Sequence, residues 1–288
     1  MEENFVILTD SGSDISPENA EKWGIEVMPL LFSVNDCEPI PGDKADIKQF
    51  YEEIRKGSKT STCACNYADA EAYLRKISES GKDILCISFS SGLSSTYNNV
   101  KLAAEDISED FPDSKIYVVD SLAASLGLGL LCLYASRMRA NGKTIDEVRD
   151  FIEENKLHLC HNFTVDDLFY LKRGGRVSAA TAVVGSMLSI KPLLHVDNEG
   201  HLVSIGKARG RKAALLSLAE TAAKNSLDPR EQTVLISHGD CAEDAEYLAE
   251  LVREKLSPKE VIIDYIGPVI GSHSGAGTVA IFYLGAER

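Results

Sequence analysis

The chain has 288 residues, of which 44% are hydrophobic and 26% charged, a composition typical of folded globular proteins and not of disordered or low-complexity chains. Its length suits two domains of about 100 to 200 residues each. The 44 acidic against 30 basic residues give a net charge of −14, which repels nucleic acid phosphates and anionic lipid headgroups. A nucleic acid partner is therefore disfavoured, and membrane contact is expected to be transient at most.

The first part of the chain alternates short apolar runs with longer amphipathic ones. Residues 5–8, 84–88 and 115–119 are predicted strands, and each is followed by a polar loop and a helix. Ser16 followed by a proline predicts the start of the first helix, with Ser16 as its N-cap. The second predicted helix covers about 95–110, and the third is a long helix that follows the loop at 120–125 and ends at 139. Strand-loop-helix units in series predict a parallel sheet with right-handed crossovers.

Ligands of open parallel sheets bind outside the carboxyl ends of the strands. In this chain those ends are followed by the loops 9–14, 89–95 and 120–125, and all three loops are rich in hydroxyl side chains. The sequence therefore places the candidate site at this edge of the N-terminal sheet.

The pattern changes after a predicted helix at 145–154, and we place a domain boundary near residue 155, giving domains 1–155 and 156–288. The turn Asp197–Gly200 between two short strands indicates a hairpin, so the second sheet is predicted to be mixed. The expected strands are 193–196, 203–206, 233–237, 261–265 and 278–284, and the expected helices are 179–189, 212–225 and 242–255.

The chain carries neither a candidate membrane span nor a disulfide framework. No apolar run approaches the roughly 18 to 20 residues that a bilayer requires, and the N-terminus is acidic where a signal peptide would be basic. The seven cysteines contain no C-x-x-C pair. We therefore expect a cytoplasmic protein with reduced thiols.

Several motifs of known chemistry fail in their context. Gly127-Leu128-Gly129 lies within a predicted helix and Gly275-Ala276-Gly277 precedes a β-rich run, so neither predicts a dinucleotide site. No G-x-S-x-G nucleophile elbow occurs. His158, Cys160 and His161 lack a further partner at metal-ligand spacing, so they do not predict a metal site.

Three segments carry stronger signals. Lys59–Thr62 contains three hydroxyl residues just before a predicted helix. Phe89–Tyr97 runs from a strand end into a helix N-terminus, where backbone N–H groups and the helix dipole favour an anion. Gly267–Gly277 is predicted to be a glycine-rich loop that holds one histidine.

Taken together with other motifs in the same order, these segments resemble the DegV family of bacterial fatty-acid-binding proteins over nearly the whole chain. The motifs that carry the resemblance are Thr9-Asp10-Ser11 with Ser13-Asp14, Thr60-Ser61, Ser90–Tyr97, Asp120-Ser121, Asp166–Leu168 with Leu171–Val177, Lys191-Pro192 and Gly267–Gly277.

The resemblance implies a two-domain α/β protein that holds a long-chain fatty acid between its domains and presents the carboxylate to a separate fatty acid kinase for phospholipid synthesis. It also implies that Thr60, with its neighbour Ser61, and Ser94 bind the carboxylate. Arg176 and His273 match the family's arginine after Gly-Gly and its late histidine, and we assign them to the phosphorylated product or to the partner. We expect no catalytic residue in this chain, no metal and no cofactor apart from the bound fatty acid.

The chain departs from the family pattern in one place, since Thr62-Cys63 follows Thr60-Ser61 where the family usually has Gln-Pro. Neutral hydroxyls agree with the implied role, because they orient a carboxylate while its oxygens stay able to accept a phosphoryl group. An alternative is a small-molecule phosphotransferase or hydrolase of a related α/β fold, with Ser94 or His273 as nucleophile. A DNA-binding regulator is a third hypothesis, and the net charge opposes it.

Overall fold

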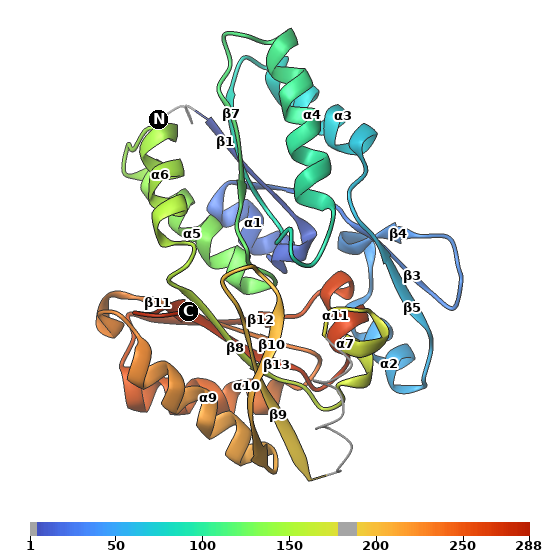
Figure 1. Cartoon of the computed structure of the whole chain (residues 1–288), viewed down its shortest axis with the longest axis vertical. Helices are drawn as coiled ribbons and strands as arrows, with labels where there is room; N and C mark the ends of the chain where they lie inside the picture. Colours follow the sequence, from blue (N-terminus) through green and yellow to red (C-terminus); the bar gives the residue numbers. More distant parts are fainter. Residues whose placement is uncertain (1–4, 178–188) are drawn as a thin grey trace.

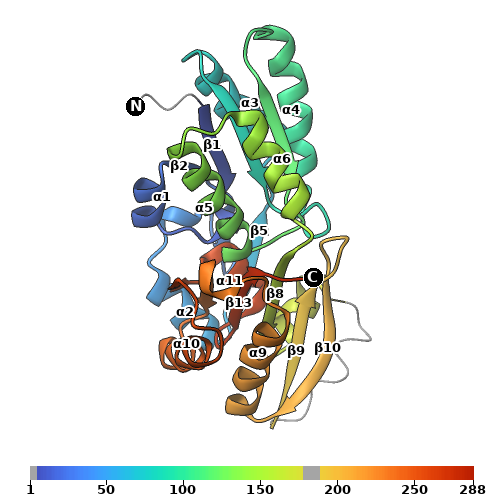
Figure 2. The same cartoon turned by 90° about the vertical axis from the view of Figure 1, so that its left-hand side faces the viewer.

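The computed structural model describes residues 5–177 and 189–288 and shows an α/β protein built on two main sheets and a small third one (Figures 1 and 2). Both the parallel and the mixed sheet were predicted, and both are confirmed. The helix expected at 179–189 falls, except for its last residue, outside the described residues. None of the helices in the described ranges is long and apolar enough to span a membrane.

The first sheet is entirely parallel, with the strand order β2-β1-β6-β7. Its strands are β1 (Phe5–Asp10), β2 (Ile25–Met28), β6 (Asp83–Ser88) and β7 (Ile116–Asp120). The six residues of β1 are all buried, as expected of a strand covered by helices on both faces. The helices of this part are α1 (Pro17–Trp23), α3 (Tyr67–Ser78), α4 (Thr96–Asp110), α5 (Leu126–Ala140) and α6 (Ile145–Asn155), with the 3-10 turn η1 (Ser11–Ser13) after β1.

The second sheet has six strands in the order β10-β9-β8-β13-β11-β12, of which only β11 and β12 pair in parallel. The predicted hairpin is confirmed as the antiparallel pair β9 and β10. The strands are β8 (Leu159–Thr164), β9 (Ile190–Val196), β10 (Leu202–Arg209), β11 (Thr233–His238), β12 (Glu260–Tyr265) and β13 (Val279–Leu284). The helices are α7 (Phe169–Arg173), α9 (Arg211–Asn225), α10 (Ala242–Leu256) and α11 (Pro268–Ser274), with the 3-10 turn η4 (Pro229–Glu231).

A third sheet of three strands, β4-β3-β5, was not predicted. It consists of β3 (Leu31–Val34), β4 (Ile40–Pro41) and β5 (Thr60–Cys63) and lies beside α2 (Ile47–Arg55). The 3-10 turn η2 (Gly42–Lys44) connects β4 to α2 in the chain. The strand β5 reads Thr-Ser-Thr-Cys and has no apolar alternation, so nothing local marks it. Its pairing with β3 is what makes it a strand.

The glycine-rich segment 267–277 is also different from the prediction, because most of it forms the helix α11. Pro268 occupies the first helical position, where its fixed φ and missing N–H are tolerated. Gly271 faces Tyr51, and a Cβ built on Gly271 would come within 2.8 Å of the Tyr51 hydroxyl. The glycine therefore allows close packing of a buried helix and does not mark a loop.

The helix α5 packs between the two main sheets and is buried along most of its length. One continuous hydrophobic cluster contains Ile7 of β1, Leu131 of α5 and Phe282 of β13. The sheet strands of the first part end at residue 120 and those of the second begin at residue 159, on either side of the boundary expected near residue 155. The division into two domains stays a prediction, and the shared core shows that the two parts pack closely.

Candidate functional site

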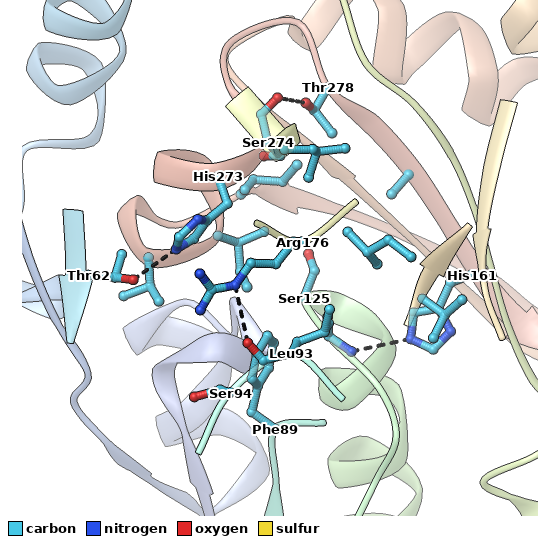
Figure 3. A pocket seen from close by; sticks show the side chains of 18 of the residues that line it. Thr62, Phe89, Leu93, Ser94, Ser125, His161, Arg176, His273, Ser274 and Thr278 are labelled. Atoms are coloured by element: carbon cyan, nitrogen blue, oxygen red, sulfur yellow. Dashed lines mark hydrogen bonds between the residues drawn. The ribbon is translucent and has the colours of Figure 1, made fainter. Parts of the chain in front are cut away.

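A cavity lies where the carboxyl ends of β6 and β7, the start of α5, the strands β8 and β13 and the helix α11 meet. It encloses about 980 Å³ of empty space, counting its open mouth. Most of its wall is apolar, and Figure 3 shows the side chains that line it. The apolar wall includes Phe89, Phe163, Leu202, Ile266, Ile270 and Phe282.

The polar groups of the cavity are unevenly distributed. In Figure 3, Thr62 and His273 lie together on one side, Arg176 lies next to them, and His161 lies on the opposite side. Ser94 also lines the cavity, below Arg176 in this view. Thus one end of the cavity offers a hydroxyl, an imidazole and a guanidinium, and the rest is largely apolar.

Arg176 is half-buried and lines the polar end. Its Nε donates a hydrogen bond to the carbonyl of Leu93 over 3.2 Å, and its Nη1 donates to the carbonyl of Gly174. Burial lowers the pKa of the guanidinium from its usual value, and no carboxylate among the described residues counters that effect. The side chain is therefore held in place by carbonyl groups while its positive charge is left for an anion.

His273 lies beside this cation. Its Nε2 and Thr62 Oγ1 are 2.8 Å apart and share a hydrogen bond. Burial, followed by the positive charges of Arg176 and Arg173, lowers the pKa of the imidazole from 6.5 to about 4. His273 is therefore neutral at pH 7. Gly174 makes this placement possible, because a Cβ there would lie 2.3 Å from Nδ1 of His273.

The lowered pKa of His273 predicts a pH dependence of stability. The unfolded chain protonates this histidine near pH 6.5 and the folded chain only near pH 4, so the free energy of unfolding should fall as pH decreases through this window. The loss is at most about 3 kcal/mol, at 1.36 kcal/mol per pKa unit. The measurement is urea unfolding of the wild type and of His273→Gln between pH 7 and pH 4.

Comparison with His273→Gln is needed because Asp10 acts in the opposite direction. Burial raises the pKa of Asp10 to about 6, so its contribution increases stability as pH falls below that value. Subtracting the variant's unfolding free energy from that of the wild type removes this common contribution. A difference that stays constant from pH 7 to pH 4 would contradict the neutral state of His273.

Ser94 lies at the start of α4, as predicted, and lines the cavity. Its hydroxyl accepts a hydrogen bond from the backbone N–H of Thr96 over 3.2 Å and is 2.9 Å from Thr96 Oγ1. These contacts fix the hydroxyl at a helix N-terminus, where a negative charge is favoured. The carboxylate contact that we assign to Ser94 stays a prediction.

Thr60 and Ser61 are not among the residues that line the cavity. The hydroxyl of Thr60 donates to the carbonyl of Ser272 and accepts from Arg173, both over 3.1 Å. Ser61 points to the other face of β5, where its hydroxyl lies 2.7 Å from that of Ser33. Thr62, two residues beyond Thr60 on the same face of the strand, takes the position at the cavity.

Sequence reasoning also missed a buried network next to the cavity. The Ser125 hydroxyl, at the start of α5, donates to Asp14 over 2.5 Å and lies 3.0 Å from that of Ser237. The N–H of Gly267 donates to the other oxygen of Asp14 over 2.9 Å. Burial raises the pKa of Asp14 well above its usual value. The motif Ser13-Asp14 was visible in the sequence, but its partners come from distant parts of the chain.

The histidines near residue 160 do not gather around a common point with Cys160. His158 Nδ1 lies 3.0 Å from the carbonyl of Gly285, and Cys160 is contacted by the amide of Asn225. His161 is fully buried in the cavity wall, where its Nε2 accepts a hydrogen bond from the N–H of Ala124 over 3.4 Å. Its role in the wall could not be inferred from the local sequence.

Comparison with known proteins identifies the family. A family model described as "Uncharacterised protein, DegV family" matches residues 4–286. The chain belongs to the DegV family. A DegV domain-containing protein of Clostridium perfringens is 46% identical over 287 residues, which are 99% of this chain and 98% of that protein.

Solved structures of DegV proteins share the whole fold. A DegV lipid-binding protein from Thermotoga maritima is 31% identical, with a TM-score of 0.87 and 99% of each chain covered. A second protein from Thermotoga maritima, whose structure is reported to reveal a fatty acid binding function, is also 31% identical, with a TM-score of 0.85 and 98% of this chain and 99% of the other covered. Coverage of 98 to 99% of this chain means that the match includes both main sheets.

Proposed function

We propose that this DegV protein binds one long-chain fatty acid in the cavity and presents its carboxylate to a separate fatty acid kinase, which phosphorylates it for phospholipid synthesis in the cytoplasm. The observation that carries the proposal is the polarity of the cavity, whose one end holds Thr62, Ser94 and Arg176 and whose remaining wall is largely apolar. A fatty acid has the same division into a charged head and an apolar tail. The lipid and fatty acid binding of the two relatives from Thermotoga maritima supports this choice.

The tail supplies most of the affinity. Each methylene group that leaves water contributes about 0.8 kcal/mol, so a chain of sixteen carbons offers on the order of 12 kcal/mol before the cost of ordering it. The aromatic residues Phe89, Phe163 and Phe282 line the wall along which such a chain would lie. The main role of the headgroup contacts is therefore to orient the carboxylate, not to supply affinity.

At the polar end, we assign the carboxylate to the hydroxyls of Thr62 and Ser94. Thr60 and Ser61 then support the site without contacting the carboxylate. The hydroxyl of Thr60 bonds to the carbonyl of Ser272 and that of Ser61 to the hydroxyl of Ser33, and these bonds hold β5 in position. Arg176 and His273 are assigned to the more highly charged acyl phosphate or to the kinase. A neutral His273 agrees with this role, since it can donate or accept a hydrogen bond as the product forms.

The alternative, a phosphotransferase or hydrolase that acts on its own, requires an activated nucleophile. The hydroxyl of Ser94 pairs with Thr96, and the imidazole of His273 pairs with Thr62. Within residues 5–177 and 189–288, no hydrogen bond joins Ser94 to a histidine or a carboxylate. These pairings favour the carrier.

The experiment that tests the proposal is mass spectrometry of an organic extract of the purified protein. We expect one equivalent of a long-chain fatty acid per chain, because the cavity has one polar end for a headgroup and one largely apolar wall for a tail. The same sample, incubated with ATP alone, should form no acyl phosphate. A protein that is reproducibly empty, takes up no added fatty acid and hydrolyses ATP or esters by itself would overturn the proposal.

A further inference from the structure

The turn of the hairpin β9–β10 packs on the loop that carries Ser94. This loop, residues 89–95, joins β6 to α4 in the first part of the chain, whereas the turn, residues 197–201, belongs to the second sheet. In both views of the whole chain, the turn reaches from the mixed sheet up to the lower edge of the parallel sheet (Figures 1 and 2). The Oγ of Ser90 donates a hydrogen bond to the carbonyl of Gly200 over 3.0 Å. The loop is therefore held by a contact from the other part of the protein.

Two glycines make this contact close. A Cβ built on Gly200 would lie 2.1 Å from the Oγ of Ser90, and a Cβ built on Gly92 would lie 2.6 Å from the carbonyl oxygen of Glu199. Gly200 also has a φ of +79°, a left-handed conformation that favours glycine. At these points there is no room for a side chain between the turn and the loop, so the two segments are in direct contact.

Ser90 also organises the loop itself. Its carbonyl accepts the N–H groups of Leu93 over 3.1 Å and of Ser94 over 3.2 Å. Its hydroxyl, besides donating to Gly200, accepts the N–H of Gly92 over 3.2 Å. Ser90 is fully buried and is not among the residues that line the cavity, whereas Ser94 is. Ser90 is therefore placed to act on a ligand only through the backbone that positions Ser94.

From these contacts we infer that Ser90 is a positioning residue: bonded to Gly200, it holds the loop so that the hydroxyl of Ser94 orients the fatty acid carboxylate for phosphoryl transfer. The inference rests on the proposed function and adds to it a residue that does not touch the ligand. Phosphoryl transfer depends steeply on the position of the attacking oxygen, whereas burial of the tail does not. A small displacement of Ser94 should therefore slow acyl phosphate formation and leave the protein loaded.

The test is a double-mutant cycle of Ser90→Ala and Ser94→Ala, measured with the partner kinase and ATP on protein loaded with a sixteen-carbon fatty acid. Ser90→Ala should lower kcat for acyl phosphate formation about five- to tenfold, because the loop no longer holds Ser94 in place. The KM for the loaded carrier and its fatty acid content should stay within about twofold of the wild type, since burial of the tail is unchanged. In the Ser94→Ala background, Ser90→Ala should lower kcat by less than about twofold further.

Ser91→Ala is the matched control, because it removes a serine hydroxyl from the next position of the same loop. The N–H of Ser91 donates to Asp120, but its hydroxyl makes no hydrogen bond within residues 5–177 and 189–288, and it does not line the cavity. The kcat of Ser91→Ala should therefore stay within about twofold of the wild type.

Gly200→Ala tests the same contact from the side of the turn. A Cβ at this position would push against Ser90, so the variant should reproduce the loss of kcat seen in Ser90→Ala, and only while the Ser94 hydroxyl is present. Gly142→Ala controls for backbone strain, because Gly142 has the same φ of +79° and a Cβ built on it meets nothing within 4 Å. Its kcat should match that of the wild type.

The outcomes separate this inference from the function on which it rests. If the wild type binds no fatty acid and yields no acyl phosphate with the kinase, the proposed function fails. If it does both, the role of Ser90 alone is refuted by any of three results: Ser90→Ala is no slower than Ser91→Ala, it is folded but empty, or it lowers kcat equally with and without the Ser94 hydroxyl. Should Ser90→Ala fail to fold, Gly200→Ala supplies the same cycle, with Gly142→Ala as its reference.

Discussion

Replacing Thr62 and Ser94 together by alanine is expected to reduce kinase-dependent formation of acyl phosphate by about a hundredfold or more. Each hydroxyl that donates to a charged carboxylate contributes about 1.5 to 3 kcal/mol, and two such bonds together reach that factor. The fatty acid content of the protein should fall much less, because burial of the tail keeps the affinity high enough for the cavity to stay filled. The measurement is acyl phosphate formed by the double variant in the presence of the partner kinase and ATP, beside the fatty acid content of the same protein.

The control for this prediction is the pair Thr60→Ala and Ser94→Ala. Thr60 and Thr62 lie on the same face of β5, and only Thr62 lines the cavity, so the control removes the same atoms two residues away. Thr62→Ser, which keeps the hydroxyl, should retain most of the activity. If the Thr60 pair loses as much activity as the Thr62 pair or more, the carboxylate is held as the family resemblance implies, and our assignment of Thr62 is wrong.

The difference between Thr60 and Thr62 shows where sequence reasoning reaches its limit. The run Lys59–Thr62 could be recognised as a hydroxyl-rich segment, and its general importance needs no structure. Which hydroxyl faces the cavity depends on the alternation of side chains along a strand. The segment is a strand because β5 pairs with β3, and this pairing places Thr62 opposite Phe32, which lies thirty residues earlier in the chain. No local sequence pattern predicts that pairing.

The two main sheets were predictable because their strands carry local signals. The strands β1, β6 and β11 are short apolar runs bounded by turn residues, and the helices α4 and α10 show an apolar period of three to four residues. Where glycine serves packing instead of a turn, the same rules fail. Gly271 in α11 looked like part of a loop, and its actual role, close contact with Tyr51, involves a residue 220 positions earlier.

Some parts of the candidate site could be predicted from the sequence, and others depend on contacts between distant segments. The segment Phe89–Tyr97 was found because a hydroxyl-rich run between a buried strand and a helix is a local feature, whereas Ser94 within it was assigned from the family resemblance. Arg176 was assigned from the family resemblance, and its half-buried position at the cavity depends on the carbonyls of Leu93 and Gly174. Asp14 joins its buried network only when α5, β11 and the segment before α11 come together, so no spacing in the sequence could indicate it.

Arg176→Gln is expected to lower acyl phosphate formation by about ten- to a hundredfold while fatty acid occupancy survives. An acyl phosphate has more negative charge and more acceptor oxygens than a carboxylate, and a charge-assisted hydrogen bond from a guanidinium is worth about 1.5 to 3 kcal/mol. Gln keeps a donor group and removes the charge. Arg176→Lys, which keeps the charge and loses the planar fork, should fall between the wild type and Arg176→Gln.

Arg173→Gln decides whether the charge acts in the cavity or on the kinase. Arg173 stacks on Phe169 and Tyr170 and donates to Thr60, and it does not line the cavity. A basic surface that docks the kinase would give a different result. Arg173→Gln would then slow acyl phosphate formation as much as Arg176→Gln does, and both losses relative to the wild type would shrink in parallel as ionic strength rises, because salt screens the docking interaction. We expect a much smaller loss for Arg173→Gln. An Arg176→Gln protein that is folded but empty would instead show that this guanidinium holds the carboxylate of the free acid.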